Sequence, residues 1–124
     1  MVYFSRGTNF EINFFFLDFQ DDGHAQCLLH VFVDSCHNLE SPAKYKESSK
    51  PSPIVELYVG NALESQKTWP QYHTNDPVFE QGFVFTVINP YSDDLHIKVI
   101  DSGHKDAEIG YLKIRISSNI SVHK

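Results

Sequence analysis

Short apolar segments separated by turn-forming residues recur along the chain, and this spacing constrains the fold more than any other feature. The segments are rich in β-branched and aromatic residues, and they cover residues 27–34, 54–59, 63–68, 78–87, 95–100 and 109–116. Clusters of Pro, Asn, Asp, Ser and Gly lie between them, at residues 48–53, 75–77 and 89–94. Short strands at regular intervals are typical of an antiparallel β-sandwich. No stretch has the 3.6-residue period of an amphipathic helix, so we predict an all-β fold.

Length and charge exclude several classes of protein. The chain has 124 residues, 41% of them apolar, and a formal net charge of −6. This length suits one domain, and no window approaches the ~20 apolar residues that a transmembrane helix needs. Since nucleic-acid binding needs a basic face, the acidic balance predicts no nucleic-acid partner. Two cysteines are too few for a disulfide scaffold and fit a reducing compartment, although one disulfide stays open.

The first 24 residues differ in composition from the rest of the chain. Six of the ten phenylalanines lie before Gln20, and residues 10–16 alternate with period two, which predicts a strand. Acidic residues interrupt this run and no small-residue cleavage site follows it, so a signal peptide is the less favoured alternative. We expect three parts: an atypical Phe-rich segment and linker over residues 1–24, a β-sandwich over residues 25–120, and a tail over residues 121–124.

Candidate metal and catalytic sites are weak. Five residues have the ligand chemistry of a zinc site, namely His24, Cys27, His30, Cys36 and His37. On an extended strand, however, Cys27 and His30 point to opposite faces. Cys36 and His37 are adjacent in a loop and have no third orienting group, so they make a poor nucleophile and base. The chain also lacks a Gly-rich phosphate loop and a nucleophile elbow. We therefore expect no enzyme activity, no metal site and no cofactor.

Four motifs occur in an order that resembles the C2 domain family, the calcium- and lipid-binding β-sandwich. The resemblance covers about residues 26–120. The motifs are an apolar strand ending in Asn38-Leu39, a Pro-Ser-Pro turn at residues 51–53, a Lys67-Thr68 step before the run from Thr74 to Phe85, and Leu95 to Asp101 followed by Ile109 to Leu112. Phe79 stands at the family's Trp position.

Within that family, four segments are most similar to the extended synaptotagmins and to their second C2 domain, namely residues 33–39, 51–60, 64–67 and 89–95. This likeness implies a Greek-key sandwich in a tether that acts in lipid transport at contacts between the endoplasmic reticulum and the plasma membrane, on the cytoplasmic face. The chain would be a fragment, since it has no membrane anchor and no lipid-transfer module. The alternative is a free-standing small β-domain that mediates protein–protein binding.

The resemblance also implies five calcium-binding Asp positions on two loops, of which Asp101 alone is clearly kept. Three others match Ser52, Gly103 and Ala107, and the loop over residues 40–50 has no Asp. Calcium takes six to eight oxygen ligands. A single exposed carboxylate therefore predicts no calcium binding at micromolar levels, and we expect Asp101 to be an ordinary strand-end residue.

Basic residues are the remaining candidates for lipid contact: Lys44, Lys46, Lys50, Lys67 and Lys105. Each Lys near an anionic membrane contributes roughly 1 kcal/mol. We therefore expect weak, calcium-independent contact with phospholipid membranes, and rank a neighbouring domain or protein partner above it.

The predicted sandwich is truncated. A full C2 domain has eight strands, whereas we count six between Cys27 and Ile116. Missing strands would leave open sheet edges, which favour aggregation. Residues 10–19 are the candidate for one substitute strand.

Overall fold

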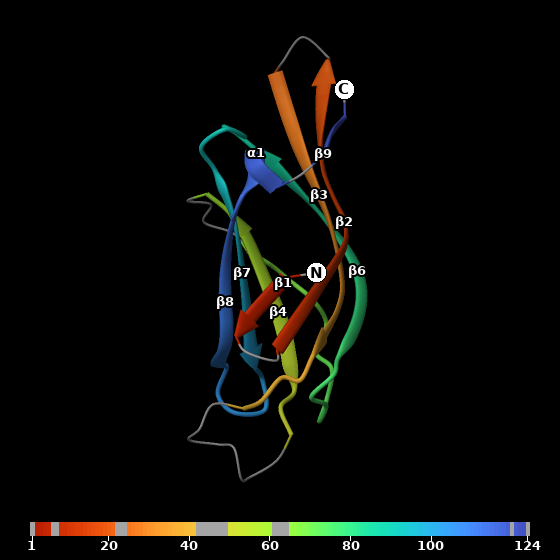
Figure 1. Cartoon of the computed structure of the whole chain (residues 1–124), viewed down its shortest axis with the longest axis vertical. Helices are drawn as coiled ribbons and strands as arrows, with labels where there is room; N and C mark the ends of the chain where they lie inside the picture. The colour runs from red at the N-terminus through yellow and green to blue at the C-terminus, as the bar shows by residue number, and fades with distance from the viewer. Residues whose placement is uncertain are drawn as a thin grey trace.

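The computed structural model describes the backbone of residues 2–5, 8–21, 25–41, 50–60, 65–119 and 121–123, and side chains within residues 27–41, 50–60 and 65–117. Its strands form two sheets that face each other across an apolar core (Figure 1). The predicted all-β antiparallel sandwich is confirmed. Within the described ranges the one helix is the four-residue turn α1 (Ile116–Asn119), and no helix there is long and apolar enough to cross a membrane.

The first sheet has the order β1-β2-β3-β6, with β9 parallel to β2. Its strands are β1 (Val2–Ser5), β2 (Thr8–Asp21), β3 (Ala25–His37), β6 (Val78–Val87) and β9 (Ser121–His123). The strand predicted over residues 10–16 is confirmed within the longer β2, which pairs with β3 from Asn9↔His37 to Asp21↔Ala25. It thus supplies an added strand. The domain boundary at residue 24 remains a prediction, although the strands on its two sides pair with each other.

The second sheet has the order β5-β4-β7-β8. Its strands are β4 (Pro53–Val59), β5 (Gln66–Lys67), β7 (Asp94–Asp101) and β8 (Ala107–Arg115). The predicted strands agree with these bounds to within two residues, except that of the described residues 65–68 in the segment 63–68 only Gln66 and Lys67 form a strand. Residues 61–64 lie outside the described part. The six strands expected between Cys27 and Ile116 are β3 to β8.

The core lies where the inward faces of the two sheets meet. Side chains alternate across a strand, and the inward set on β4 and β7 is fully buried: Val55, Leu57, Leu95, Ile97 and Val99. The same alternation on β3 buries Cys27, Leu29, Val31 and Val33. Cys27 and Cys36 are both buried and free, so the disulfide left open by the sequence is absent.

Strand β6 contains a β-bulge opposite the end of β3. Val33 pairs with Gln81, and Ser35 pairs with Val78, so β6 advances three residues while β3 advances two. Glu80 takes up the difference with a positive φ of 48°. Phe79 and Phe83 both point into the core, as residues four apart on one strand do.

The two sheets approach each other along both lateral edges. On one side β1 lies against β8. On the other side β5 and the residue after Thr68 reach across to β6, where Gln66 Nε2 donates to the Val84 carbonyl at 2.8 Å and the Trp69 N–H donates to Gln81 Oε1 at 2.8 Å. The described strands therefore enclose the core from both sides.

Candidate functional site

Asp101 lies at the lower end of the sandwich in Figure 1, where β7 turns into β8. It pairs with Ala107, so residues 102–106 form a short hairpin loop. Pro53 on β4 is its partner on the other side. The expectation that this carboxylate is exposed is wrong, because Asp101 is 0% exposed. The cause is that the loops of three separate segments close over it.

Both carboxylate oxygens of Asp101 accept hydrogen bonds from protein donors. Oδ1 accepts from the backbone N–H of Ser52 and of Gly103, each at 3.0 Å. Oδ2 accepts from Ser41 Oγ at 2.8 Å and contacts His104 Nδ1 at 2.6 Å. Ser41 and Ser52 are themselves buried. A buried carboxylate is stable only when it is paired and hydrogen-bonded in this way.

These contacts set the protonation state of Asp101. Burial by itself raises the pKa of the carboxyl, but the hydrogen bonds from Ser52, His104, Ser41 and Gly103 together outweigh it, and the net pKa is lowered. The group is therefore ionised at neutral pH, and the charge is neutralised from within the molecule.

Gly103 and Ser52, which replace two family Asp positions, have structural roles here. A Cβ atom at residue 103 would lie 3.3 Å from Ser52 Oγ and 3.4 Å from Asp101 Oδ1, so a side chain would crowd both groups. Ser52 Oγ also accepts the N–H of His73 at 3.1 Å. The positions that carry acidic ligands in the family pattern thus hold the loops together around one carboxylate.

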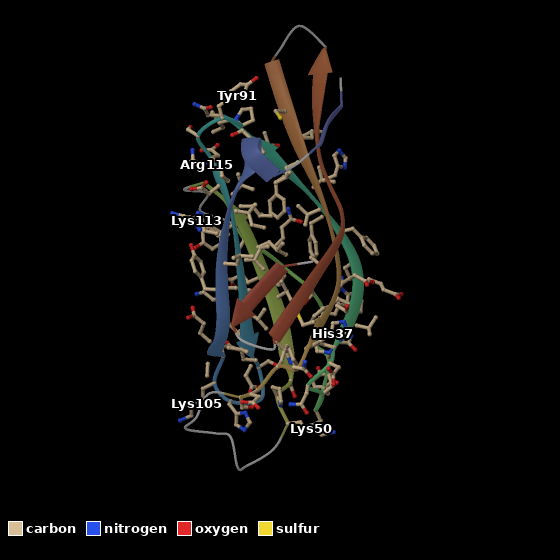
Figure 2. All side chains as sticks on the ribbon, in the orientation of Figure 1. His37, Lys50, Tyr91, Lys105, Lys113 and Arg115 are labelled. Atoms are coloured by element: carbon tan, nitrogen blue, oxygen red, sulfur yellow. The ribbon has the colours of Figure 1, made fainter. Side chains whose placement is uncertain are left out.

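The predicted lipid-contact lysines do not form one cluster. Lys50 and Lys105 are exposed at the same end of the molecule (Figure 2). Lys67 lies on β5 and forms an ion pair with Glu56 at 3.4 Å. Lys44 and Lys46 lie outside the described residues. Of the zinc candidates, His24 also lies outside the described residues. Among the residues described, no group of three or more His, Cys, Asp or Glu side chains is placed to hold a metal. Burial raises the pKa of Cys36, which keeps its thiol protonated.

A second polar cluster, missed by the sequence analysis, lies on the outward face of β4, β7 and β8. The rings of Tyr58 and His96 stack at 4.4 Å with an interplanar angle of 7°. The Tyr111 hydroxyl contacts His96 Nδ1 at 2.5 Å. In the strand register His96 is opposite Lys113, and Lys98 is opposite Tyr111. We call these five residues the sheet-face cluster. Each strand alternates in the sequence, but only the pairing register brings the five together.

These observations define a class of protein, a two-sheet antiparallel β-sandwich with its polar loops gathered around a buried carboxylate at one end. The family model described as "C2 domain" matches residues 27–124. The chain belongs to the C2 domain family.

Several curated relatives of the chain are extended synaptotagmins. The chain is 38% identical over 100 residues to extended synaptotagmin-2 of Homo sapiens, covering 81% of this chain and 10% of that protein. It is 40% identical over 109 residues to human extended synaptotagmin-3, covering 74% and 12%. The chain therefore spans about a tenth of the length of these relatives.

Solved structures agree with this placement. A structure of extended synaptotagmin 2 that contains its SMP domain and two C2 domains matches with a TM-score of 0.63 and 39% identity, over 73% of this chain and 20% of that one. A calcium-bound structure of two C2 domains of extended synaptotagmin 2 matches with a TM-score of 0.61 and 36% identity, over 73% and 30%. The recognition made from sequence motifs is confirmed.

Proposed function

We propose that this C2 domain is a non-catalytic, calcium-independent module that contacts phospholipid membranes and a neighbouring domain or protein. On this proposal it serves an extended-synaptotagmin-like tether in lipid transport at contacts between the endoplasmic reticulum and the plasma membrane. The extended-synaptotagmin relatives support the lipid-binding class. The observation that carries the proposal is the hydrogen-bonded burial of Asp101.

Calcium independence follows from the oxygen atoms at this end of the molecule. Calcium needs six to eight oxygen ligands, several of them carboxylates. Asp101 is buried and both of its oxygens already accept hydrogen bonds, so recruiting it would break bonds to Ser41 and His104. Asp106 on the same loop is exposed and has a backbone φ of 53°. Within the described hairpin loop, one buried and one exposed carboxylate do not offset the dehydration of the ion.

Membrane contact is supported by the exposed basic residues at the same end. Lys50 and Lys105 lie at the same end of the molecule (Figure 2), whereas the acidic Glu56 is paired with Lys67 on the sheet. Basic side chains near an anionic bilayer contribute roughly 1 kcal/mol each, which gives weak binding from two of them. This weakness is the reason to include a protein partner in the proposal.

The test is calorimetry with calcium together with sedimentation of the purified chain with phosphatidylserine vesicles, in calcium and in chelator. We expect no heat from a calcium site tighter than about 10 µM, the range of sensor sites, and equal vesicle binding in both buffers. Lys50→Ala with Lys105→Ala should weaken vesicle binding, whereas Lys67→Ala, whose charge is already paired, should change it little. A micromolar calcium site, or binding only with calcium, contradicts calcium independence. No binding to vesicles at all leaves the protein-partner role and contradicts membrane contact.

A further inference from the structure

We propose that two copies of this chain associate through the outer edge of β8, which continues the second sheet of one copy into that of the other. The order β5-β4-β7-β8 places β8 at the end of its sheet, with β7 as its pairing partner among the described strands. Strand β1 lies against β8 but pairs with β2 of the first sheet. After β8 the chain turns through α1 into β9, which also joins β2 (Figure 1). This association goes beyond the proposed membrane function and does not depend on it.

The core-facing side of β8 is less completely covered than that of its neighbour β7. Leu95 and Ile97 on β7 are 0% exposed, whereas their register partners Ile114 and Leu112 are only partly buried. Ile109 on β8 is also only partly buried. Partly exposed apolar side chains along an end strand favour the addition of a further strand, which would cover them.

The register identifies the backbone groups of β8 that point away from β7. The Ile116 N–H donates to the Asp93 carbonyl at 3.4 Å, in line with the β7–β8 ladder. Hydrogen-bonded pairs alternate along an antiparallel ladder. By this alternation the backbone groups of Leu112 face β7, and the N–H and C=O groups of Tyr111 and Lys113 face outward. An added strand would therefore bond to these two residues.

This edge differs from that of β6, the end strand of the first sheet. On β6, Gln66 Nε2 occupies the Val84 carbonyl at 2.8 Å. In the part of the chain that the structure describes, no side chain hydrogen-bonds to the backbone of Tyr111 or Lys113. The backbone edge of β8 is therefore the more accessible template for strand addition.

A two-fold axis beside Leu112 makes this edge complementary to itself. Such an axis brings the same surface of both copies together. It places Leu112 opposite Leu112 of the second copy in a non-hydrogen-bonded pair, where side chains are closest. Lys113 then exchanges backbone hydrogen bonds with Tyr111 of the second copy, and its ammonium group meets an aromatic ring. The partly exposed leucine is covered at the centre of the interface.

Charge complementarity selects the same register. In the ladder with β7, Glu108 is the next paired residue after Gly110, because the residue between them is bulged. Counted along the edge in this way, Glu108 lies opposite Arg115 of the second copy when the axis passes beside Leu112. Both side chains are exposed, and Arg115 is oriented by its ion pair with Asp94 at 2.9 Å. The two-fold axis repeats this contact, so the dimer gains two ion pairs between the copies.

The size of this contact predicts a weak dimer. Interfaces that bury less than about 1,200 Å² belong to weak and transient complexes, and one strand edge with its flanking side chains falls in that class. We therefore expect a Kd between roughly 1 µM and 1 mM. Because the axis is two-fold, association stops at two copies.

Sedimentation velocity at increasing protein concentration measures the association. We expect a monomer–dimer equilibrium. Glu108→Arg turns both ion pairs into repulsions and should raise the Kd about tenfold. The matched control is Glu80→Arg, which makes the same charge change on exposed β6 of the other sheet. Because charges farther apart than about 8 Å are screened at physiological salt, the control should leave the Kd nearly unchanged.

Cysteine crosslinking tests the register. In the proposed dimer the two Leu112 Cα atoms are about 4.5 Å apart, within the range of about 4.4–6.8 Å that a disulfide spans. The two Lys113 residues are diagonal neighbours about 7–8 Å apart. With oxidised glutathione as the oxidant, Leu112→Cys should form a covalent dimer and Lys113→Cys should not. The wild-type chain, whose Cys27 and Cys36 are buried, gives the background.

Four results would overturn the inference. They are a chain that stays monomeric up to about 1 mM, equal effects of Glu108→Arg and Glu80→Arg, growth beyond two copies, and association in which Leu112→Cys crosslinks no better than Lys113→Cys. Unchanged thermal unfolding of each variant shows that the fold is intact. Vesicle binding by the monomer is measured separately, so failure of the dimer leaves the proposed membrane function in place.

Discussion

Asp101 illustrates how one residue can keep a family position and change its role. Its four hydrogen bonds tie together Ser41, Ser52 and the hairpin at residues 103–104, which are distant in sequence. His104 is nearly buried, with its side chain 13% exposed, and its contact with the carboxylate is short. The carboxylate thus organises the tip through protein donors, and the stability of this end depends on one side chain.

Replacing this carboxylate by its neutral amide should destabilise the protein. We expect Asp101→Asn to lower the free energy of unfolding at pH 7 by about 3 kcal/mol. The substitution removes the negative charge that its hydrogen-bonding partners surround, and it places the amide NH2 group of Asn against groups that are themselves donors. Urea unfolding followed by circular dichroism measures the change. Asp106→Asn on the same loop is the control and should stay within about 0.5 kcal/mol, as surface substitutions do. Equal effects of the two would contradict the role given to Asp101.

The contribution of Asp101 to stability depends on pH with a defined sign. The folded-state pKa of Asp101 is lowered, so the unfolded chain binds its proton more readily. The stabilisation is then fully present above the unfolded pKa of about 3.9 and is lost as pH falls through the folded value. The difference between wild type and Asp101→Asn should therefore be constant near neutral pH and shrink below about pH 4. A difference that grows with acid would contradict this account.

At the residue scale the sequence predicted which positions matter better than how they are arranged. Comparison with the family motifs identified Asp101 and the replacements Ser52 and Gly103. The exposure of Asp101 was predicted wrongly because its burial depends on Ser41 and His104, which reach it only through tertiary contacts between loops. Lys98 and Lys113 were missed because a basic pair on two strands is visible only once the strand register is known.

Among the elements, β6 shows how a strand absorbs an extra residue. Between the pairs Val33↔Gln81 and Ser35↔Val78, β6 contains one residue more than β3, and Glu80 at this bulge has a positive φ of 48°. The spacing of Phe79 and Phe83 does not predict this bulge, because residues four apart already share a face of a regular strand. Only the pairing register shows it, together with the left-handed backbone of Glu80. A non-glycine residue in that conformation is strained by roughly 1–2 kcal/mol relative to glycine.

Glycine at the bulge should therefore stabilise the protein. We expect Glu80→Gly to raise the free energy of unfolding by about 1 kcal/mol, because glycine adopts a positive φ without steric cost. Thr86→Gly in the same strand is the matched control. It is exposed and in regular pairing with Leu28, so glycine there should lower stability by about 0.5–1 kcal/mol. Thermal unfolding of both variants gives the sign of each change in stability. A change of the same sign for both variants would contradict the bulge at Glu80.

For the whole molecule, the N-terminal strand β2 completes what the predicted sandwich lacks. It pairs with β3 along most of its length, from Asn9 to Asp21, and carries β1 and β9 on its other edge. The alternation of residues 10–16 was enough to predict a strand. Its partner could not be predicted, because these residues match no motif of the family and pairing between strands depends on the assembled fold.

Hydrogen exchange tests this assembly in the intact chain. Amides of residues 9–21 should exchange slowly, with protection comparable to that of β3, because both strands are paired along most of their length. The amides of Lys105 and Asp106, which are exposed in the hairpin loop between β7 and β8, provide the fast-exchanging reference. Exchange of residues 9–21 at the rate of that loop would contradict the pairing of β2 with β3.

The side-chain bonds from Gln66 and Trp69 to β6 have a consequence for solubility. A strand at the end of a sheet is a template on which another copy can grow, and β6 is such a strand. Gln66 already occupies the Val84 carbonyl in the middle of it, and Gln81 is bonded to the neighbouring segment. A second molecule that docked there would first have to displace both. Two amide side chains thus protect the exposed flank of β6 against fibril-like stacking.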